Sequence, residues 1–187
     1  MEIGAVMYSI IGEIGKEKIQ SDVTSDIGLS RYYIQMIMGK CERHIGVTDE
    51  ETTGSLCEAL LHFMLTVCTL PSSRKVQINN VDLDIVIPNI NTLKNFPDRA
   101  IVIQISKGPN EMNEYQSRNF IQVQPNDKNL WIISKHQLSK RYINYIVKLK
   151  GNTKYGPDER NFSHIIYDIH KFLNQTGDKS LRFFPTT

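Results

Sequence analysis

Four side chains in the middle of the chain have types and spacing that could support chemistry: Glu58, Asp84, Gln104 and Lys107. Carboxylate and amide oxygens are ligands that suit Mg²⁺, and a lysine ammonium stabilises negative charge that develops during a reaction. Asp84 lies within an apolar run, where an unpaired charge is costly, so a functional role explains it better than packing does. Asp82 shares one strand face with Asp84 and is the alternative.

The elements that must position these side chains can be predicted from hydrophobic periodicity and turn residues. The first 46 residues read as helical, because apolar residues recur three and four positions apart. A polar linker follows, and then helices and β-branched strands alternate. The predicted helices are 1–15, 17–27, 30–44, 55–69, 111–118, 138–150 and 161–174. The predicted strands are 75–79, 81–88, 100–107, 120–124 and 129–134, with a turn at Asn79-Asn80, a linker at 48–53 and a polar connection at 89–99.

The second and third predicted helices meet at Gly28, with Thr24 at the position where a tight helix crossing needs a small residue. Residues 19–40 therefore resemble the DNA-binding helix-turn-helix of bacterial and archaeal regulators. The resemblance implies that residues 30–38 form the recognition helix. It places Arg31, Tyr32 and Gln35 in the major groove and Lys40 and Arg43 at the phosphates. The alternative is a helical cap on the main domain, or a dimerisation element.

The run Val81-Asp82-Leu83-Asp84-Ile85-Val86-Ile87-Pro88 and the strand that ends in Gln104-Ile105-Ser106-Lys107 form a second motif. With the Thr53-Gly54…Glu58 helix start and Trp131-Ile132-Ile133-Ser134, they resemble the PD-(D/E)xK nucleases over roughly residues 53–150. The similarity is greatest to the Mrr-type restriction endonucleases, which tend to have an N-terminal winged-helix domain. The resemblance implies an α/β fold with a restriction-endonuclease-like mixed central sheet flanked by helices. It also implies a small helical domain over residues 1–47 and a nuclease-like domain over 48–187.

The same resemblance assigns roles to the four side chains. Asp84 is the implied first ligand of Mg²⁺ or Mn²⁺, Gln104 the second through its side-chain oxygen, and Glu58 an outer ligand. Such a metal polarises the scissile phosphate and lowers the pKa of a bound water. Lys107 would orient or deprotonate that water and stabilise the developing charge.

The spacing of Gln104 and Lys107 departs from the family, in which the amide or acid and the lysine are two residues apart. In a regular strand, residues three apart point to opposite faces. Either a β-bulge restores their convergence, or Ile105 occupies the acidic position and the site is degraded.

Charge and cysteine content constrain the remaining expectations. The net charge is only +2 over 187 residues, but the stretch 137–150 has four basic residues, Lys140 and Arg141 among them, and no acid. This stretch is either a solvated helix face or a DNA contact. The three cysteines include no CxxC pair, which favours a reducing compartment and no zinc site. Since no apolar run approaches the roughly 18–20 residues of a membrane span, we expect a cytoplasmic protein without a membrane partner.

These observations lead to a functional expectation with open alternatives. The favoured function is metal-dependent hydrolysis of DNA phosphodiester bonds, and DNA is the expected partner. A homodimer would be a further implication, because nucleases that cut both strands commonly pair up. The first alternative is a non-catalytic DNA-binding regulator on a degenerate nuclease scaffold, and the second is an assembly protein whose helices mediate dimerisation.

Overall fold

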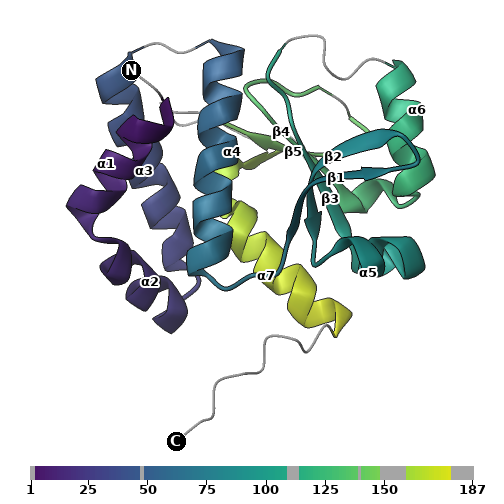
Figure 1. The fold of residues 1–187 in the computed structure, drawn as a ribbon, viewed down its shortest axis with the longest axis horizontal. Helices are drawn as coiled ribbons and strands as arrows, with labels where there is room; N and C mark the ends of the chain where they lie inside the picture. Colours follow the sequence, from purple (N-terminus) through teal and green to yellow (C-terminus); the bar gives the residue numbers. More distant parts are fainter. Residues whose placement is uncertain (1–2, 47–48, 109–113, 139, 148–158, 178–187) are drawn as a thin grey trace, which may run out of the picture.

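The computed structural model describes residues 3–46, 49–108, 114–138, 140–147 and 159–177 (Figure 1). It shows an α/β protein in which four N-terminal helices are followed by a six-stranded mixed sheet with flanking helices. The N-terminal helices confirm the helical reading of this part of the sequence. They are α1 (Ile3–Ile14), α2 (Lys16–Ser25), α3 (Leu29–Ile45) and α4 (Glu50–Val67).

The six strands lie side by side in chain order. β2 pairs antiparallel with both of its neighbours, β1 and β3, and β3, β4, β5 and β6 run parallel. The strands are β1 (Ser73–Ile78), β2 (Val81–Ile87), β3 (Ile101–Ile105), β4 (Leu130–Ser134), β5 (Ile143–Ile146) and β6 (Glu159–Asn161). The strands predicted around β1 to β4 are therefore confirmed.

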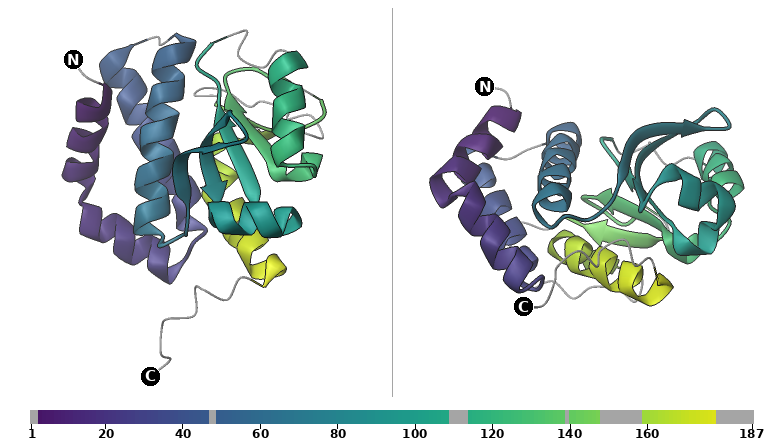
Figure 2. Two further views of the ribbon diagram at one scale, coloured as in Figure 1. Left: turned by 45° about the vertical axis from the view of Figure 1, so that its right-hand side comes forward. Right: turned by 60° about the horizontal axis from the view of Figure 1, so that its bottom comes forward.

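Helices cover both faces of the sheet (Figure 2). α4 and α7 (Ile165–Thr176) pack on one face, where one hydrophobic cluster joins Leu60, Ile103 and Ile169 with residues of α1 and α3. The second cluster lies on the opposite face beside α6 (Glu114–Val123) and α5 (Ile90–Asn95), and it includes Val102 and Leu93. The sheet is therefore buried on both sides, in keeping with its continuous apolar strands.

Two asparagines set the register of the hairpin formed by β1 and β2. Asn79 and Asn80 have φ values of 50° and 62°, the left-handed backbone that a two-residue type I′ turn requires. Ile78 consequently pairs with Val81, and the pairing continues to Ser73 and Val86. Lys75 and Asp84 stand opposite each other in this register, but they are not among the paired residues of the two strands.

Three sequence predictions of secondary structure are wrong. The predicted helix at 138–150 contains the strand β5, because an apolar stretch rich in β-branched and aromatic residues pairs there with β4. The predicted strand at 120–124 belongs largely to α6. The connection at 89–99 contains α5 and the 3-10 helix η1 (Pro97–Arg99), and the Asn89 side chain caps α5 by accepting a hydrogen bond from the Thr92 N–H.

Several element boundaries also move. α4 begins within the predicted linker, because the Asp49 side chain caps it by accepting a hydrogen bond from the Thr52 N–H. The last predicted helix instead starts as β6 and a 3-10 helix, η3 (Phe162–His164), before α7. The remaining 3-10 helix, η2 (Asp127–Asn129), precedes β4. The predicted domain boundary at residues 47 and 48 lies outside the described residues.

Within the part of the chain that the structure describes, no helix combines the length and the apolar composition needed to cross a membrane.

Candidate functional site

The candidate site lies where α4 meets the hairpin and the end of β3. Gly54 is the reason that α4 can come so close to β3. A Cβ atom at this position would lie 2.7 Å from the Ser106 carbonyl oxygen and 2.9 Å from Lys107 Cγ, closer than real Cβ contacts. Glu58 follows one helical turn later on the same helix face, which directs its side chain toward the end of β3. The glycine thus places the Glu58 carboxylate beside Lys107.

A local distortion of the hairpin brings Asp84 to the same place. Lys75 has φ 47°, and a non-glycine residue in this conformation costs on the order of 1–3 kcal/mol. The side-chain alternation of β2 also shifts here: Leu83 packs in the cluster beside α6, whereas Ile85 packs in the cluster beside α4. Beyond this point the hairpin curves toward α6 (Figure 2). The distortion directs Lys75 and Asp84 toward α4.

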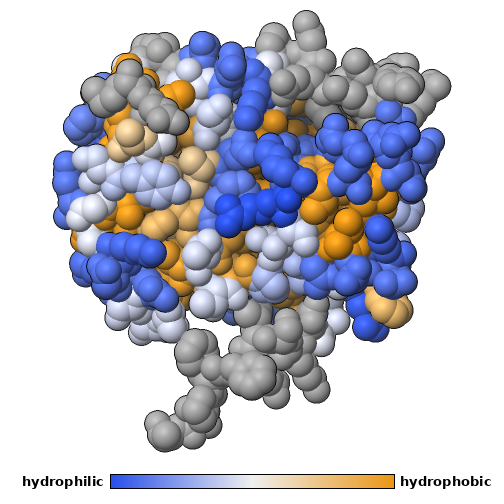
Figure 3. All heavy atoms as spheres, in the orientation of Figure 1, coloured by the Kyte–Doolittle hydropathy of each residue, from blue (hydrophilic) through white to orange (hydrophobic). Residues whose placement is uncertain are grey.

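Four charged side chains form an ion-pair cluster there, which we call the carboxylate–lysine cluster: Glu58, Lys75, Asp84 and Lys107. Lys75 Nζ lies 2.8 Å from Glu58 Oε1 and 2.6 Å from Asp84 Oδ1. Lys107 Nζ lies 2.8 Å from Glu58 Oε2. In the view of Figure 3, hydrophilic residues gather between α4 and the hairpin, with apolar surface on both sides. The cluster combines two anions and two cations, so its formal charge is zero.

Gln104 has a structural role next to this cluster. Its Oε1 accepts a hydrogen bond from the Asp84 N–H (3.0 Å), and its Nε2 donates to the Asp82 carbonyl oxygen (2.8 Å). In return, Asp84 Oδ2 accepts a hydrogen bond from the Ile105 N–H (2.9 Å). The two side chains thus continue the interstrand hydrogen bonding beyond the last β2–β3 pair, Ile85 with Ile103.

The structure brings three of the four predicted residues together and gives the fourth another task. Glu58, Asp84 and Lys107 belong to the cluster, whereas the Gln104 side chain is buried against the backbone of β2. β3 is regular, with Ile103 and Ile105 both in the cluster on the α4 side. The bulge in β3 that would have aligned Gln104 with Lys107 is therefore not formed, and Ile105 instead occupies the position two residues before Lys107 on the α4 side of the sheet.

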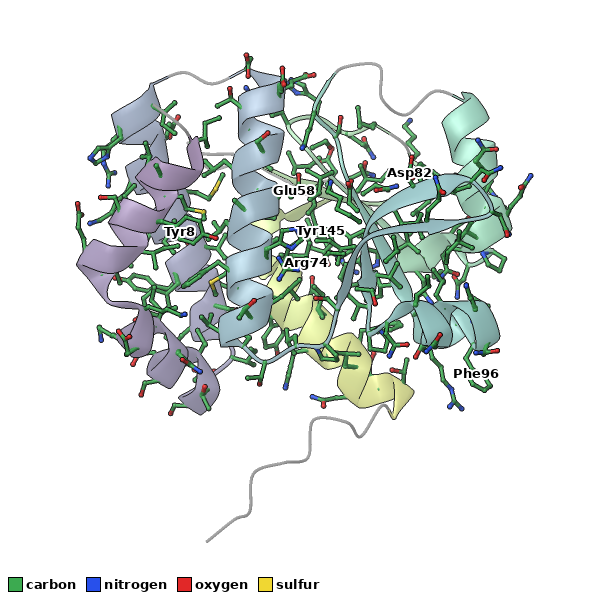
Figure 4. All side chains as sticks on the ribbon, viewed as in Figure 1. Tyr8, Glu58, Arg74, Asp82, Phe96 and Tyr145 are labelled. Carbon is green, nitrogen blue, oxygen red and sulfur yellow. The ribbon has the colours of Figure 1, made fainter. Side chains whose placement is uncertain are left out.

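Asp82 lies apart from the cluster. Its Oδ1 accepts a hydrogen bond from Gln77 Nε2 (2.8 Å) on the exposed side of the hairpin. Figure 4 shows Asp82 farther out along the hairpin than Arg74 of β1. Glu58 of α4 is labelled near Arg74, where α4 faces β1. The distortion between Leu83 and Ile85 separates Asp82 from Asp84, so the two aspartates are not interchangeable.

The lysines favour the charged form of Glu58. Burial opposes ionisation of this carboxyl group, but hydrogen bonds from Lys107 and Lys75 outweigh it, so the pKa of Glu58 lies below its usual value. Burial likewise disfavours the charged form of Lys75, but the hydrogen bonds to Asp84 and Glu58 outweigh it and raise the Lys75 pKa. Both groups are therefore ionised at neutral pH, and the ion pairs persist there.

His62 lies one helical turn after Glu58 and adds a neutral donor at the edge of the cluster. Its Nε2 is 3.8 Å from Glu58 Oε1, and its Nδ1 is buried without a hydrogen-bond partner among the described residues. Burial and the positive charges of Arg74 and Lys75 lower the pKa of His62, against the opposing effect of Glu58 and Asp84. At neutral pH the imidazole is therefore uncharged.

The two carboxylates fit a divalent cation, although Lys75 competes for the position. Glu58 Oε1 and Asp84 Oδ1 already hold one cation between them, the Lys75 ammonium. Mg²⁺ is commonly bound by one or two carboxylates together with waters, so these two would suffice. No cluster of three or more His, Cys, Asp or Glu suited to a metal occurs among the described residues. Gln104 Oε1 does not fit, because it is committed to the Asp84 N–H.

The structure places two of the predicted DNA-contacting residues of α3 against the C-terminal part of the chain. The Arg31 guanidinium lies 4.2 Å from the centre of the Tyr167 ring, and Gln35 Nε2 donates a hydrogen bond to Ser163 Oγ (3.3 Å). Presenting either side chain to DNA would require breaking these contacts. Tyr32 is exposed on α3.

The other basic residues named as DNA contacts are on the surface. Lys40 pairs with Glu13 (3.5 Å), and Arg43 is exposed near the end of α3. Arg141 Nε lies 2.6 Å from Asp127 Oδ2, and Lys140 is exposed. The predicted helix that was to carry Lys140 and Arg141 is not formed, so they do not share a helix face.

Sequence reasoning missed Gly54 as a packing residue and both Lys75 and His62 as members of the site. Lys75 could have been found by counting outward from the Asn79-Asn80 turn, since a two-residue turn fixes the register and places position 75 opposite Asp84. His62 could have been found from its four-residue spacing to Glu58 on a helix.

Comparisons of this chain with protein-family models, with curated proteins and with solved structures found no match. The geometry of the site and the sequence resemblance described above are therefore the basis of the proposed function.

Proposed function

We propose that the protein is a divalent-metal-dependent nuclease that hydrolyses DNA phosphodiester bonds. The observation that carries this proposal is the convergence of Glu58 from α4 and Asp84 from β2 on one cation, with Lys107 beside them. DNA as the substrate, and a restriction-endonuclease-like form of the mixed sheet, belong to the same proposal. They rest on the sequence resemblance, and the delivery of site residues by α4 and the adjacent strands β2 and β3 supports them.

Asp84 and Glu58 would hold Mg²⁺ or Mn²⁺, which supplies polarisation of the phosphate and activation of a water. The ammonium of Lys107 is held in place by Glu58 Oε2 and is partly exposed, so it can neutralise charge on a phosphate oxygen. Gln104 acts as a positioning residue, because its two hydrogen bonds to β2 fix the backbone that carries Asp84. This assignment replaces the ligand role that the sequence suggested for Gln104.

One observation favours a second candidate, a DNA-binding regulator without catalysis. Every carboxylate oxygen of Glu58 and Asp84 already has a partner: Lys75, Lys107 or the Ile105 N–H. A site whose charges are balanced internally can persist as a structural ion-pair cluster. The regulator would keep the fold and would bind duplex DNA without cutting it.

Nicking of supercoiled plasmid in Mg²⁺ or Mn²⁺ distinguishes the two candidates. We expect the wild type to nick DNA, and Asp84→Asn and Lys107→Ala to lose about 100-fold or more of the rate. Asp82→Asn is the matched control, because Asp82 is on the same strand and its side chain bonds to Gln77 away from the cluster; its rate should stay near wild type. Binding of duplex DNA without any nicking in either metal would establish the regulator instead.

A further inference from the structure

Lys75 occupies the position between the two carboxylates that the proposed function assigns to a metal. Its ammonium contacts one oxygen of Glu58 and one of Asp84, at 2.8 Å and 2.6 Å. Lys107 contacts the other oxygen of Glu58, at 2.8 Å. Lys75 therefore bridges the two carboxylates.

The two lysines also differ in how easily they can move. The Lys75 side chain is 56% exposed and belongs to β1, an edge strand of the sheet, whereas that of Lys107 is 34% exposed. The Lys107 side chain is also confined by α4, since a Cβ on Gly54 would lie 2.9 Å from Lys107 Cγ. The more exposed side chain of Lys75 can therefore move into solvent more easily than the side chain of Lys107.

The backbone indicates that the bridging position of Lys75 is maintained by its ion pairs. Lys75 has φ 47°, a conformation that disfavours a residue with a Cβ atom. Glycine and asparagine adopt it more readily. The two contacts to carboxylates favour a lysine at this point.

We propose that Lys75 is a place-holding cation that occupies the metal position of the carboxylate–lysine cluster and leaves it when a divalent cation binds. This inference rests on the proposed function. With Lys75 in place, the two carboxylates and two lysines sum to zero charge. When a divalent cation takes its position, the charges of the cation, Glu58, Asp84 and Lys107 sum to +1, which attracts an anionic phosphate. The exchange thus couples metal binding to a positive charge that attracts the substrate phosphate.

Calorimetric titration with Mn²⁺, without DNA, tests the exchange directly. We expect Lys75→Met and Lys75→Gly to bind Mn²⁺ about tenfold more tightly than the wild type, because the cation no longer has to break the ion pairs of Lys75. Arg74→Met is the control, since it removes the same charge from the neighbouring position, where no ion pair with Glu58 or Asp84 is seen among the described residues. Its affinity should change by about twofold or less.

The outcomes separate this inference from the proposed function. If the wild type binds Mn²⁺ and both Lys75 variants bind it no more tightly, the place-holding role is wrong and the metal site stands. If neither the wild type nor the variants bind Mn²⁺, both ideas fail. If circular dichroism shows that Lys75→Met is unfolded, Lys75→Gly still tests the proposal, because glycine tolerates the left-handed backbone at this position.

Discussion

At the scale of single residues, Gln104 shows how a side chain of the expected type can have an unexpected role. Its amide group acts like a peptide unit added to the edge of β2, because it accepts from one backbone N–H and donates to one backbone carbonyl. An amide can do both at once, because it has an acceptor oxygen and a donor N–H group. A carboxylate would accept from the Asp84 N–H but would repel the Asp82 carbonyl oxygen.

Substitution of Gln104 by glutamate therefore distinguishes a positioning role from a ligand role. We expect Gln104→Glu to lower the unfolding free energy by about 1–3 kcal/mol, measured by urea denaturation, since the part-buried Asp82 carbonyl loses its donor. Mn²⁺ affinity should not rise. The exposed Gln122→Glu on α6 controls for added charge and should leave stability nearly unchanged. A tighter Mn²⁺ complex of Gln104→Glu would show that position 104 is a ligand after all.

At the scale of elements, the sequence predicts those whose signal is local and fails where tertiary pairing decides. The four N-terminal helices and β1 to β4 have long apolar periods or β-branched runs, so their existence follows from the residues. β5 differs, because its β-branched and aromatic residues span only four positions and become a strand by pairing with buried β4. The site shows the same division. Glu58, Asp84 and Lys107 could be chosen by type and spacing. The turn register places Lys75 opposite Asp84, but its contact with Glu58 depends on a distortion of the hairpin that the register does not predict.

The approach of α4 to β3 is an element-scale feature that one substitution tests. Gly54→Ala should destabilise the fold by about 1–3 kcal/mol, because the added methyl group would meet the Ser106 carbonyl at 2.7 Å and force α4 away. Gly39→Ala on α3 is the matched control, since nothing lies within 4 Å of its Cβ position. It should instead stabilise the protein by about 0.5–1 kcal/mol through helix propensity. Equal effects of the two substitutions on the melting temperature would contradict the proposed close packing.

At the scale of the whole molecule, the N-terminal helices and the sheet share one interior. Met7 of α1 and Ile37 of α3 belong to the same hydrophobic cluster as Ile103 of β3 and Ile169 of α7. Between α3 and α4 the described residues contain no β-hairpin, so the wing of a winged-helix domain is not seen there. The N-terminal helices α1 to α3 thus pack on α4 and α7, which in turn cover one face of the sheet. Any contribution of α3 to DNA binding must come from the side chains that this packing leaves exposed.

Substitutions of Arg31 and Arg43 distinguish a packing role of α3 from a DNA-binding role. Arg31→Ala should lower the melting temperature, because it removes the stacking of the guanidinium on Tyr167, an interaction worth about 0.5–2 kcal/mol. It should leave the salt dependence of duplex binding unchanged.

Arg43 is exposed, so Arg43→Ala should leave the melting temperature unchanged. If α3 contacts the DNA backbone, fluorescence anisotropy should show weaker binding by Arg43→Ala, with a slope of log affinity against log salt that is smaller by about 0.9. If Arg31→Ala instead binds DNA more weakly, with a smaller salt slope and normal stability, the prediction is wrong. That result would mean that α3 detaches from α7 to enter the DNA groove.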